Sequence, residues 1–244
     1  MDLLSPQHLV VLGLTAAACV GLGLAARRDP DGRWITIVAR GLAVLLALNE
    51  IAFHVVHQLD QGLSARGDLP LHLTDAATIA AIVALWRPSA LAFELTYFWA
   101  LTATVQALLT PDLRGGFPDY RWWWFVVAHA GVVVAAVFLA WGRRRTPRPG
   151  AVRRVFAWSL GVTALAAAGT LAFDANYMFL REPPETGSLL DLMGPWPWYI
   201  ASAAALALAL FWLLDRPFDA RRGRRGPPAI PRVRVGREGP TNAG

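Results

Sequence analysis

Three ionisable side chains that could transfer protons lie close together in an otherwise apolar part of the chain. Glu50 is followed four residues later by His54, and His57 comes three residues after that. These steps place all three on one face of a helix. An ionisable group inside a membrane is costly, so this face indicates a functional site. A metal shell completed by His72 or His129 is an alternative, but helical spacing alone is weak support for it, and we expect no metal or other cofactor.

Further polar residues occur at the same end of neighbouring apolar segments. His72, Thr74 and Asp75 stand at the start of one segment, and His129 lies roughly two turns inside another. A hydrogen bond between helices would explain any one of them alone. Their common position at one end predicts a shared polar site instead.

The elements that must position these residues are seven apolar segments, most of them about twenty residues long, which is the length that crosses a bilayer as a helix. The chain has 244 residues, of which 55% are hydrophobic, too many for an ordinary soluble domain. The expected fold class is therefore an all-α, polytopic membrane bundle. We place the segments at 8–26, 35–58, 70–86, 89–110, 121–142, 154–174 and 195–215.

The arginines distinguish two sides of this bundle. All 23 basic residues are arginine. Four of them, Arg66, Arg114, Arg121 and Arg181, belong to one set of alternate loops; eighteen belong to the other set and the tail, and Arg40 lies within a segment. Because basic loops stay in the cytoplasm, we expect a multi-pass protein of the cell membrane with its N-terminus outside and its C-terminus inside. The polar site then opens to the non-cytoplasmic side.

The positive charge has a simple explanation. A net charge of +6 is compatible with nucleic-acid binding, but arginines that set the topology and contact lipid headgroups explain it better. We therefore expect membrane lipids as partners, anionic headgroups at the cytoplasmic arginine-rich loops, and no nucleic acid. Residues 216–244 are rich in Arg, Gly and Pro, which predicts a disordered cytoplasmic tail after a membrane domain of residues 1–215.

Arg40 and Glu94 form a separate pair of charges. Both are expected in the inner third of their segments. We predict an ion pair between them, with a structural role.

Three stretches on the predicted outer side have unusual sequences. They run from Leu69 to Asp75, from Gln106 to Pro118 and from Asn176 to Tyr199. Tryptophans on this side form an interfacial belt, but a belt does not explain the aspartates and prolines. A long ordered loop over a polar pocket explains them better. The side chains expected to contact a ligand in this pocket are Glu50, His54, Gln106, Asp112, Asn176, Tyr177, Asp191 and Trp196.

Several motifs in these stretches resemble a known family. They are LPLHL at 69–73, QALLTPDL at 106–113, FP at 117–118, HAG at 129–131, NYMFL at 176–180, SLLD at 188–191 and GPWPWY at 194–199. In this order they resemble the YwaF-type bacterial integral membrane proteins, which are related to eukaryotic transmembrane protein 164. The resemblance covers residues 69–199 and implies a seven-span bundle.

The eukaryotic branch of that family is associated with acyl transfer on phospholipids, through a cysteine acyl-enzyme with a histidine partner. A cysteine often follows LPLHL in the family, and this chain has Thr74 there. A threonine hydroxyl is a weaker nucleophile than a thiolate and needs a strong base beside it. The roles that the resemblance implies are Thr74 as nucleophile, His129, His72 or Asp75 as base, and Asp112 or Asp191 as the group that orients the base.

Three functions are open at this point. The first is an acyltransferase-like or lipid-hydrolysing membrane enzyme. The second is a non-catalytic protein that binds a lipid or peptide in the outer pocket. The third is a carrier with Glu50, His54 and His129 as a proton or ion path; it ranks last, because the inner halves offer mainly Arg40 and Glu94 and the sequence has no internal repeat.

Overall fold

The computed structural model describes residues 1–62, 64–113, 115–184 and 188–224, and within these ranges the chain is helical without any strand. The long helices are α1 (Pro6–Arg28), α2 (Arg33–Gln61), α3 (Leu73–Trp86), α4 (Ala90–Trp99), α6 (Tyr120–Val137), α7 (Ala151–Phe173) and α8 (Trp198–Arg224). Shorter elements are the π-helical turns η1 (Ala100–Thr104) and η2 (Phe138–Gly142), α5 (Val105–Leu109), and the 3₁₀ turns η3 (Tyr177–Phe179) and η4 (Leu189–Leu192).

The helices follow the seven predicted segments. The fourth segment is α4, η1 and α5 in direct succession, and the fifth is α6 with η2. Five helices of the described residues are long and apolar enough to cross a membrane, namely α1, α2, α6 with η2, α7 and α8, while α3 is a shorter apolar helix. The predicted fold class, an all-α polytopic membrane bundle, is confirmed.

Local capping explains where several helices begin. The Ser5 hydroxyl accepts a hydrogen bond from the His8 backbone, and proline at position 6 occupies the first turn of α1, where it loses no hydrogen bond. Ser89 caps α4 in the same way, and the Asp119 carboxylate accepts from the backbone at the start of α6. These side chains satisfy amides that have no partner within their own helix.

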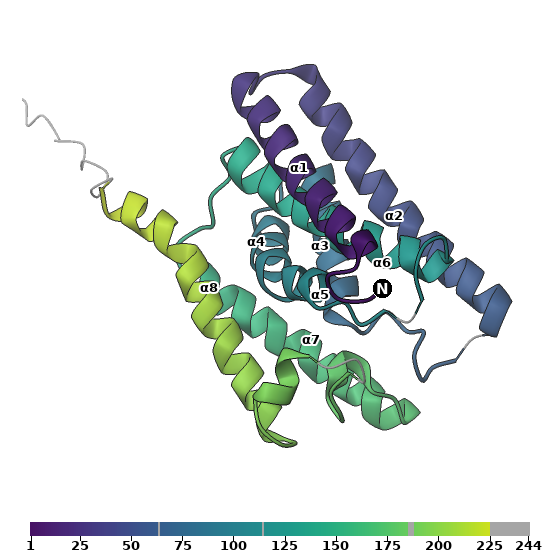
Figure 1. The fold of residues 1–244 in the computed structure, drawn as a ribbon. Coiled ribbons are helices and arrows are strands. Elements are labelled where there is room, and N and C mark those ends of the chain that lie inside the picture. Colours follow the sequence, from purple (N-terminus) through teal and green to yellow (C-terminus); the bar gives the residue numbers. More distant parts are fainter. Residues whose placement is uncertain (63, 114, 185–187, 225–244) are drawn as a thin grey trace, which may run out of the picture.

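The bundle has a central group of helices and two flanking pairs (Figure 1). Helices α3, α4 and α6 lie in the centre, α1 and α2 pack on one side of them, and α7 and α8 lie on the other side. The central core is large and aromatic, with Phe93, Phe98, Trp99 and Phe138 almost fully buried and Phe211 of α8 packed against them. Helix α8 therefore joins the core through a small part of its length.

The loops meet in two groups at opposite ends of the bundle. At one end the Arg145 guanidinium donates to the carbonyls of Ala84 (3.3 Å) and Ser89 (2.8 Å), and Arg27 donates to Trp141 O (3.2 Å). We call this the arginine end; it contains the loops 29–32, 87–89 and 143–150.

The other end contains the described residues of the loops 62–72, 110–119 and 174–197, and we call it the site end. There the Tyr177 hydroxyl accepts from Leu69 N (3.2 Å), and a His8 ring nitrogen bonds to Leu108 O (2.7 Å). The predicted separation of the loops into two sets is therefore present in the fold. Which end faces the cytoplasm stays a prediction.

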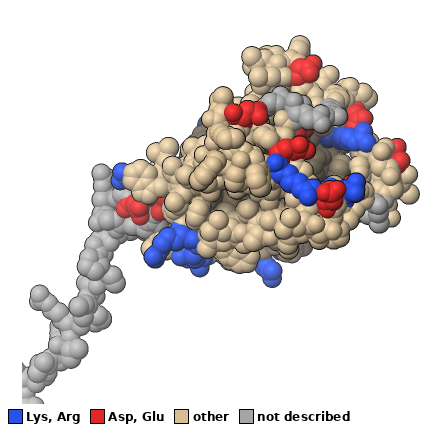
Figure 2. Space-filling model, turned by 90° about the horizontal axis from the view of Figure 1, so that it is seen from below, with Lys and Arg blue, Asp and Glu red and all other residues tan. Residues whose placement is uncertain are grey.

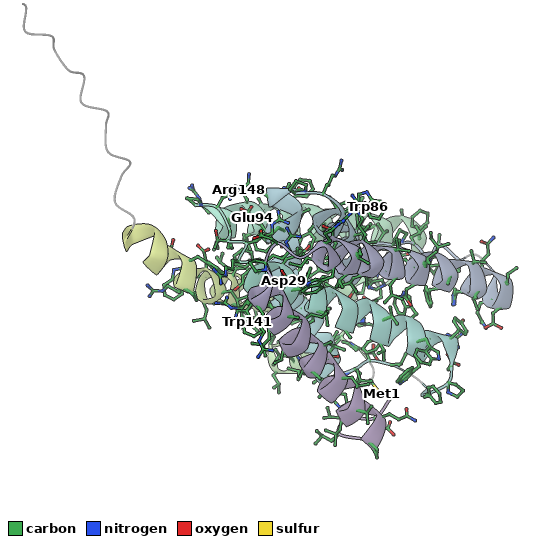
Figure 3. The ribbon with its side chains drawn as sticks, turned by 90° about the horizontal axis from the view of Figure 1, so that it is seen from above. Met1, Asp29, Trp86, Glu94, Trp141 and Arg148 are labelled. Carbon is green, nitrogen blue, oxygen red and sulfur yellow. The ribbon has the colours of Figure 1, made fainter. Side chains whose placement is uncertain are left out.

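The predicted ion pair between Arg40 and Glu94 is wrong. Glu94 is fully buried, and its carboxylate accepts from Arg148 Nε and from the Arg154 guanidinium, at 2.9 Å in both cases. Figure 3 shows Glu94 and Arg148 next to each other. Arg40 is exposed and places its guanidinium 5.5 Å from the Trp86 ring. Glu94 therefore pairs with Arg148 of the 143–150 loop and with Arg154 in the first turn of α7. By accepting hydrogen bonds from Arg148, it raises the pKa of that guanidinium.

The predicted domain boundary at residue 215 falls within a helix. Helix α8 continues to Arg224 and contains Pro217, and residues 225–244 of the predicted tail lie outside the described residues. Figure 2 shows the molecule from the side of α7 and α8, with a mostly uncharged surface between the charged side chains at its two ends. A surface of this kind suits contact with lipid chains.

Candidate functional site

A cavity of about 620 Å³ separates the central helices from α7 and α8. Its walls come from the start of α3, the α4–η1–α5 run, α6, the first half of α7, the 178–193 loop and the first half of α8. Ligand sites typically have volumes of roughly 300–1,000 Å³. Helices α7 and α8, which line the cavity, are mostly exposed on their other faces. The cavity therefore lies near the outer surface of the bundle rather than at its centre.

The lining changes from polar to apolar with depth. Near the site end the cavity is lined by His72, Thr74, Gln106, Thr110, Asp112 and Ser188. Its deeper part is lined mainly by apolar side chains, with Thr102, Ser159 and Thr163 among them; the apolar ones include Trp99, Phe156, Leu206, Ala207, Leu210 and Phe211. A molecule with a polar group at one end and a hydrocarbon at the other matches this division.

Thr74 and His129 meet at the polar end of the cavity. The Thr74 Oγ1 atom lies 3.3 Å from His129 Nε2, within the loose range found for catalytic pairs without a bound ligand. Thr74 stands in the first turn of α3, and His129 lies near the middle of α6 and is almost fully buried. The structure thus brings together the predicted nucleophile and one of its three predicted bases.

A backbone carbonyl orients the His129 ring. Its Nδ1 atom lies 2.8 Å from the carbonyl of Phe125, one turn earlier in α6. A carbonyl only accepts, so Nδ1 carries the proton and neutral Nε2 is free to accept from the Thr74 hydroxyl. The prediction that Asp112 or Asp191 orients the base is not met by this geometry: Asp112 lines the cavity, but the Nδ1 partner is Phe125.

His72 and Asp75 hold the backbone around Thr74. The Asp75 carboxylate accepts from His72 N at 2.8 Å, which caps the start of α3. His72 Nδ1 accepts from Met178 N at 3.4 Å, and its ring packs edge-on against Tyr177. Both residues therefore fix the position of Thr74 relative to the 174–197 loop.

The predicted ligand contacts in the last loop organise that loop instead. Tyr177 is fully buried; its hydroxyl donates to Ala65 O at 2.7 Å, and burial raises the pKa of its phenol. Asn176 accepts from the backbone of Arg181 and donates to the carbonyl of Glu182, both within the loop. Neither Tyr177 nor Asn176 lines the cavity.

The second half of the loop is held in a similar way. The Asp191 carboxylate accepts from Ser188 N at 2.5 Å, which caps η4, and Trp196 donates to Leu180 O at 3.0 Å while most of its ring is exposed. Neither side chain lines the cavity, although their neighbours Ser188, Leu189 and Leu190 do.

An ion-pair group ties two loops together at the surface of the site end. The exposed Asp174 carboxylate pairs with Arg181, and with Arg66 at 3.6 Å. The hydrogen bond from Arg181, with the charges of both arginines, lowers the pKa of Asp174. These contacts join the 62–72 loop to the 174–197 loop at the surface of the site end.

Glu50 and His54 lie outside the cavity, across the Trp124 ring. Trp124 lines the cavity and donates from Nε1 to Glu50 Oε2 at 3.3 Å. His54 lies beside Glu50 and interacts with it electrostatically. His57 bonds instead to Asp68 and to the Tyr120 hydroxyl.

The alternative of a metal shell finds no assembled ligand set. Across the described ranges, no group of three or more His, Cys, Asp or Glu side chains is arranged to hold a metal ion. His57 turns to Asp68, and His129 to Thr74 and Phe125.

Sequence reasoning missed the deeper half of the cavity. Trp99 donates from Nε1 to Ser159 Oγ at 2.8 Å across the gap between α4 and α7. Thr102 and Ala103 line the cavity from the π-helical turn η1, a distortion that is frequent at functional sites. Polar residues such as Ser159 and Thr163 in an apolar segment were the available signal, but they resemble ordinary helix-packing residues.

The motifs that carried the family resemblance converge on this cavity. LPLHL ends beside Thr74, QALLTPDL supplies Gln106 and Asp112, and HAG supplies His129. NYMFL and SLLD supply the loop that lies over the polar end.

Comparison with known proteins gives two matches. The model of the TMEM164 family matches residues 3–215, which include every part of the cavity. An uncharacterized protein of Treponema pallidum (strain Nichols) is 28% identical over 188 residues, which cover 75% of this chain and 76% of that protein. No solved structure matches. The expected relation to transmembrane protein 164 is confirmed, and the chain belongs to the TMEM164 family of membrane proteins.

Proposed function

We propose that this membrane protein binds a lipid acyl chain in the cavity and transfers an acyl group at the Thr74–His129 pair. The observation that carries the proposal is the contact of a hydroxyl with a buried imidazole, at 3.3 Å, at the polar end of an apolar cavity. The site is proposed to open to the non-cytoplasmic side of the cell membrane, as the distribution of arginines predicts.

The depth of the cavity suits one leaflet of a bilayer. Its lining extends along α8 from Ile200 to Phe211, which is about 16 Å of helix at roughly 1.5 Å per residue. Half of the hydrocarbon core of a bilayer is about 15 Å thick. A lipid that enters sideways between helices can thus lay one chain in the cavity while its ester group stays near Thr74.

The chemistry of the proposal follows from the tautomer of His129. The Thr74 oxygen attacks the ester carbonyl of the lipid while His129 Nε2 takes the hydroxyl proton. Nε2 then gives this proton to the departing alcohol, and the acyl group stays on Thr74. A second alcohol or a water molecule takes the acyl group by the reverse sequence.

The test compares cellular lipids in a strain that lacks the protein and in strains that express single variants. We expect wild-type protein and Thr74→Ser to change the same acyl species, and Thr74→Val and His129→Ala to change none. Thr15→Val is the matched control, because Thr15 is buried in α1 and its hydroxyl bonds only to the carbonyl of Val11 in its own helix. An active Thr74→Val variant would overturn the proposed role of the hydroxyl.

The alternative is a non-catalytic lipid- or peptide-binding protein, which the replacement of the family cysteine by Thr74 favours. It predicts that lipid copurifies equally with wild type and Thr74→Val while cellular lipids stay the same. Activity only in Thr74→Cys would identify a scaffold for acyl transfer whose reaction this chain has lost. A carrier has less support, because the deeper part of the cavity is mainly apolar and no ionisable side chain of the described residues lines it.

The arginine end is a separate proposal for lipid contact. Its loops would face the cytoplasm and attract anionic headgroups.

A further inference from the structure

A second, smaller cavity of about 320 Å³ lies at the site end. Phe53, Asp112, Leu113, Arg121 and Trp124 line it, and we call it the vestibule. Asp112 and Trp124 also line the large cavity. The two spaces therefore adjoin at these two side chains.

Helix α2 holds Trp124 with three side chains from one turn of its face. Asn49 Nδ2 donates to the Trp124 carbonyl at 3.2 Å, and the indole Nε1 donates to Glu50 Oε2 at 3.3 Å. The Phe53 ring stacks on the indole, with 4.1 Å between the ring centroids and 21° between the planes. The indole also lies edge-on to His129, at 6.4 Å between centroids. Trp124 is thus fixed between the vestibule and the catalytic pair.

Glu50 presents an unused acceptor next to this indole. Its Oε1 atom is buried and has no hydrogen-bond partner among the described residues. Buried carboxylate oxygens normally have a partner, so a polar solute that reaches this point would be bound. The Glu50–His54 face that the sequence singled out is therefore next to the site, although it does not line the large cavity.

We infer that the vestibule is a second route to the catalytic pair and that this route admits water. Trp124 is the partition between this route and the lipid cavity. In the acyl chemistry, which rests on the proposed function, the water oxygen bonds to the acyl carbon. The bond from that carbon to Thr74 Oγ1 breaks, and a water proton passes through His129 Nε2 to the threonine oxygen. A closed partition keeps the acyl group from water until a partner alcohol arrives.

The route is tested with a cysteine in place of Thr74. Cys19 is the only cysteine of the chain, so Cys19→Ala with Thr74→Cys leaves one thiol. The protein is placed in lipid nanodiscs, and the rate of thiol modification by methanethiosulfonate ethylsulfonate, a small water-soluble anion, is measured. We expect Trp124→Ala to raise this rate at least tenfold, and Glu50→Ala to raise it less, because the indole loses the acceptor of its N–H but Phe53 still stacks on it.

Trp123→Ala is the matched control. Trp123 is the adjacent residue of α6, is 49% exposed and lines neither cavity. An equal rate for Trp124→Ala and Trp123→Ala, in variants that elute as the same single species as the parent, would overturn the partition.

Charge reversal shows whether the reagent passes through the vestibule. In the Trp124→Ala background, Arg121→Glu should lower the rate with the anionic reagent and raise it with the trimethylammonium analogue, which changes the ratio of the two rates severalfold. Arg181→Glu, in another loop of the same end, should leave the ratio unchanged. Equal effects of the two charge reversals would overturn the vestibule as the route of the reagent.

These measurements need no lipid turnover. If the labelling results hold and the lipid comparison fails, the water route stands without the acyl chemistry. If labelling fails while lipids change, only the route is wrong.

Discussion

Thr74 and His129 are 55 residues apart in the chain, and each owes its position to a different part of the backbone. The cap formed by Asp75 and His72 sets the first turn of α3, and the Phe125 carbonyl sets the ring of His129. The His129 ring is therefore oriented by a backbone carbonyl rather than by a third ionisable residue, and Thr74 is positioned by the helix cap.

This geometry predicts the reactivity of a thiol placed at position 74. An imidazole within hydrogen-bond reach promotes the thiolate form, which is the reactive form. In the Cys19→Ala background, Thr74→Cys should react with a membrane-permeant maleimide at least several times faster than the same protein with His129→Ala. Thr163→Cys, which lines the deeper cavity, is the control, and its rate should not depend on His129. An unchanged rate for Thr74→Cys after removal of His129 would contradict the pairing.

At the arginine end, the buried Glu94 carboxylate depends on two arginines that are themselves 49% and 36% exposed. Arg148→Gln with Arg154→Gln leaves this buried charge without its partners, which typically costs about 3–5 kcal/mol. We expect a large drop of the thermal unfolding midpoint in detergent, followed by circular dichroism. Adding Glu94→Gln to the double variant should recover part of the loss, because the buried charge is gone. A triple variant less stable than the double variant would show that the charge is not what the arginines compensate.

The sequence predicted the candidate pair at residue level better than it predicted the ion pair. Thr74 and His129 were both predicted from sequence motifs, and the two helices that contain them pack against each other. An error of a residue or two in a predicted helix end therefore does not separate the two side chains. The partner of Glu94 depends on how the 143–150 loop folds back, and Arg148 and Arg154 compete there with Arg40 for one carboxylate. Hydropathy contains no information on that competition. The same limit applies to Tyr177 and Asn176, whose unusual motif serves the shape of the loop.

Among the elements, α6 is the one that the site depends on most. It supplies Trp124 and His129, and it approaches α2 closely at Gly131: a Cβ atom there would lie 2.8 Å from Leu46 Cδ2. Gly131→Val should cost about 1–3 kcal/mol by overpacking and should displace His129, two residues away. Gly161→Val in α7 is the control, since a Cβ there meets nothing within 4 Å. We expect a lower unfolding midpoint for the first variant only; equal midpoints would contradict the close approach.

Helix positions were predictable because hydropathy and caps agree along most of the chain. Ser5, Ser89 and Asp119 stand where helices begin, and most of the apolar runs end at arginine, proline or glycine. Two features were not predictable in this way. Helix α8 continues through Pro217 to Arg224, although this composition favours disorder, and η1 interrupts a run that reads as one regular helix. Both depend on neighbouring structure: the Tyr97 hydroxyl bonds to Leu214 O near the extension, and η1 packs on α6.

For the whole molecule, the position of the cavity between the central helices and the α7–α8 pair decides what can occupy it. A ligand there displaces no core residue, and small side chains of α8 make room for it. Ala204 lines the cavity, whereas Ala205, the next residue, faces away and is exposed.

Ala204→Trp should therefore fill the space intended for the acyl chain, and Ala205→Trp should add a ring to the outer surface only. We expect native mass spectrometry of the detergent-purified proteins to detect bound lipid in wild type and Ala205→Trp, and at least tenfold less in Ala204→Trp. Because Thr74→Val only replaces a hydroxyl at the polar end of the cavity by a methyl group of similar size, it should keep its lipid, which separates the binding of the chain from the chemistry of its ester. Lipid retained by Ala204→Trp at the wild-type level would place the bound lipid outside the cavity, on the exposed faces of α7 and α8, and would remove the basis for an acyl site between these helices.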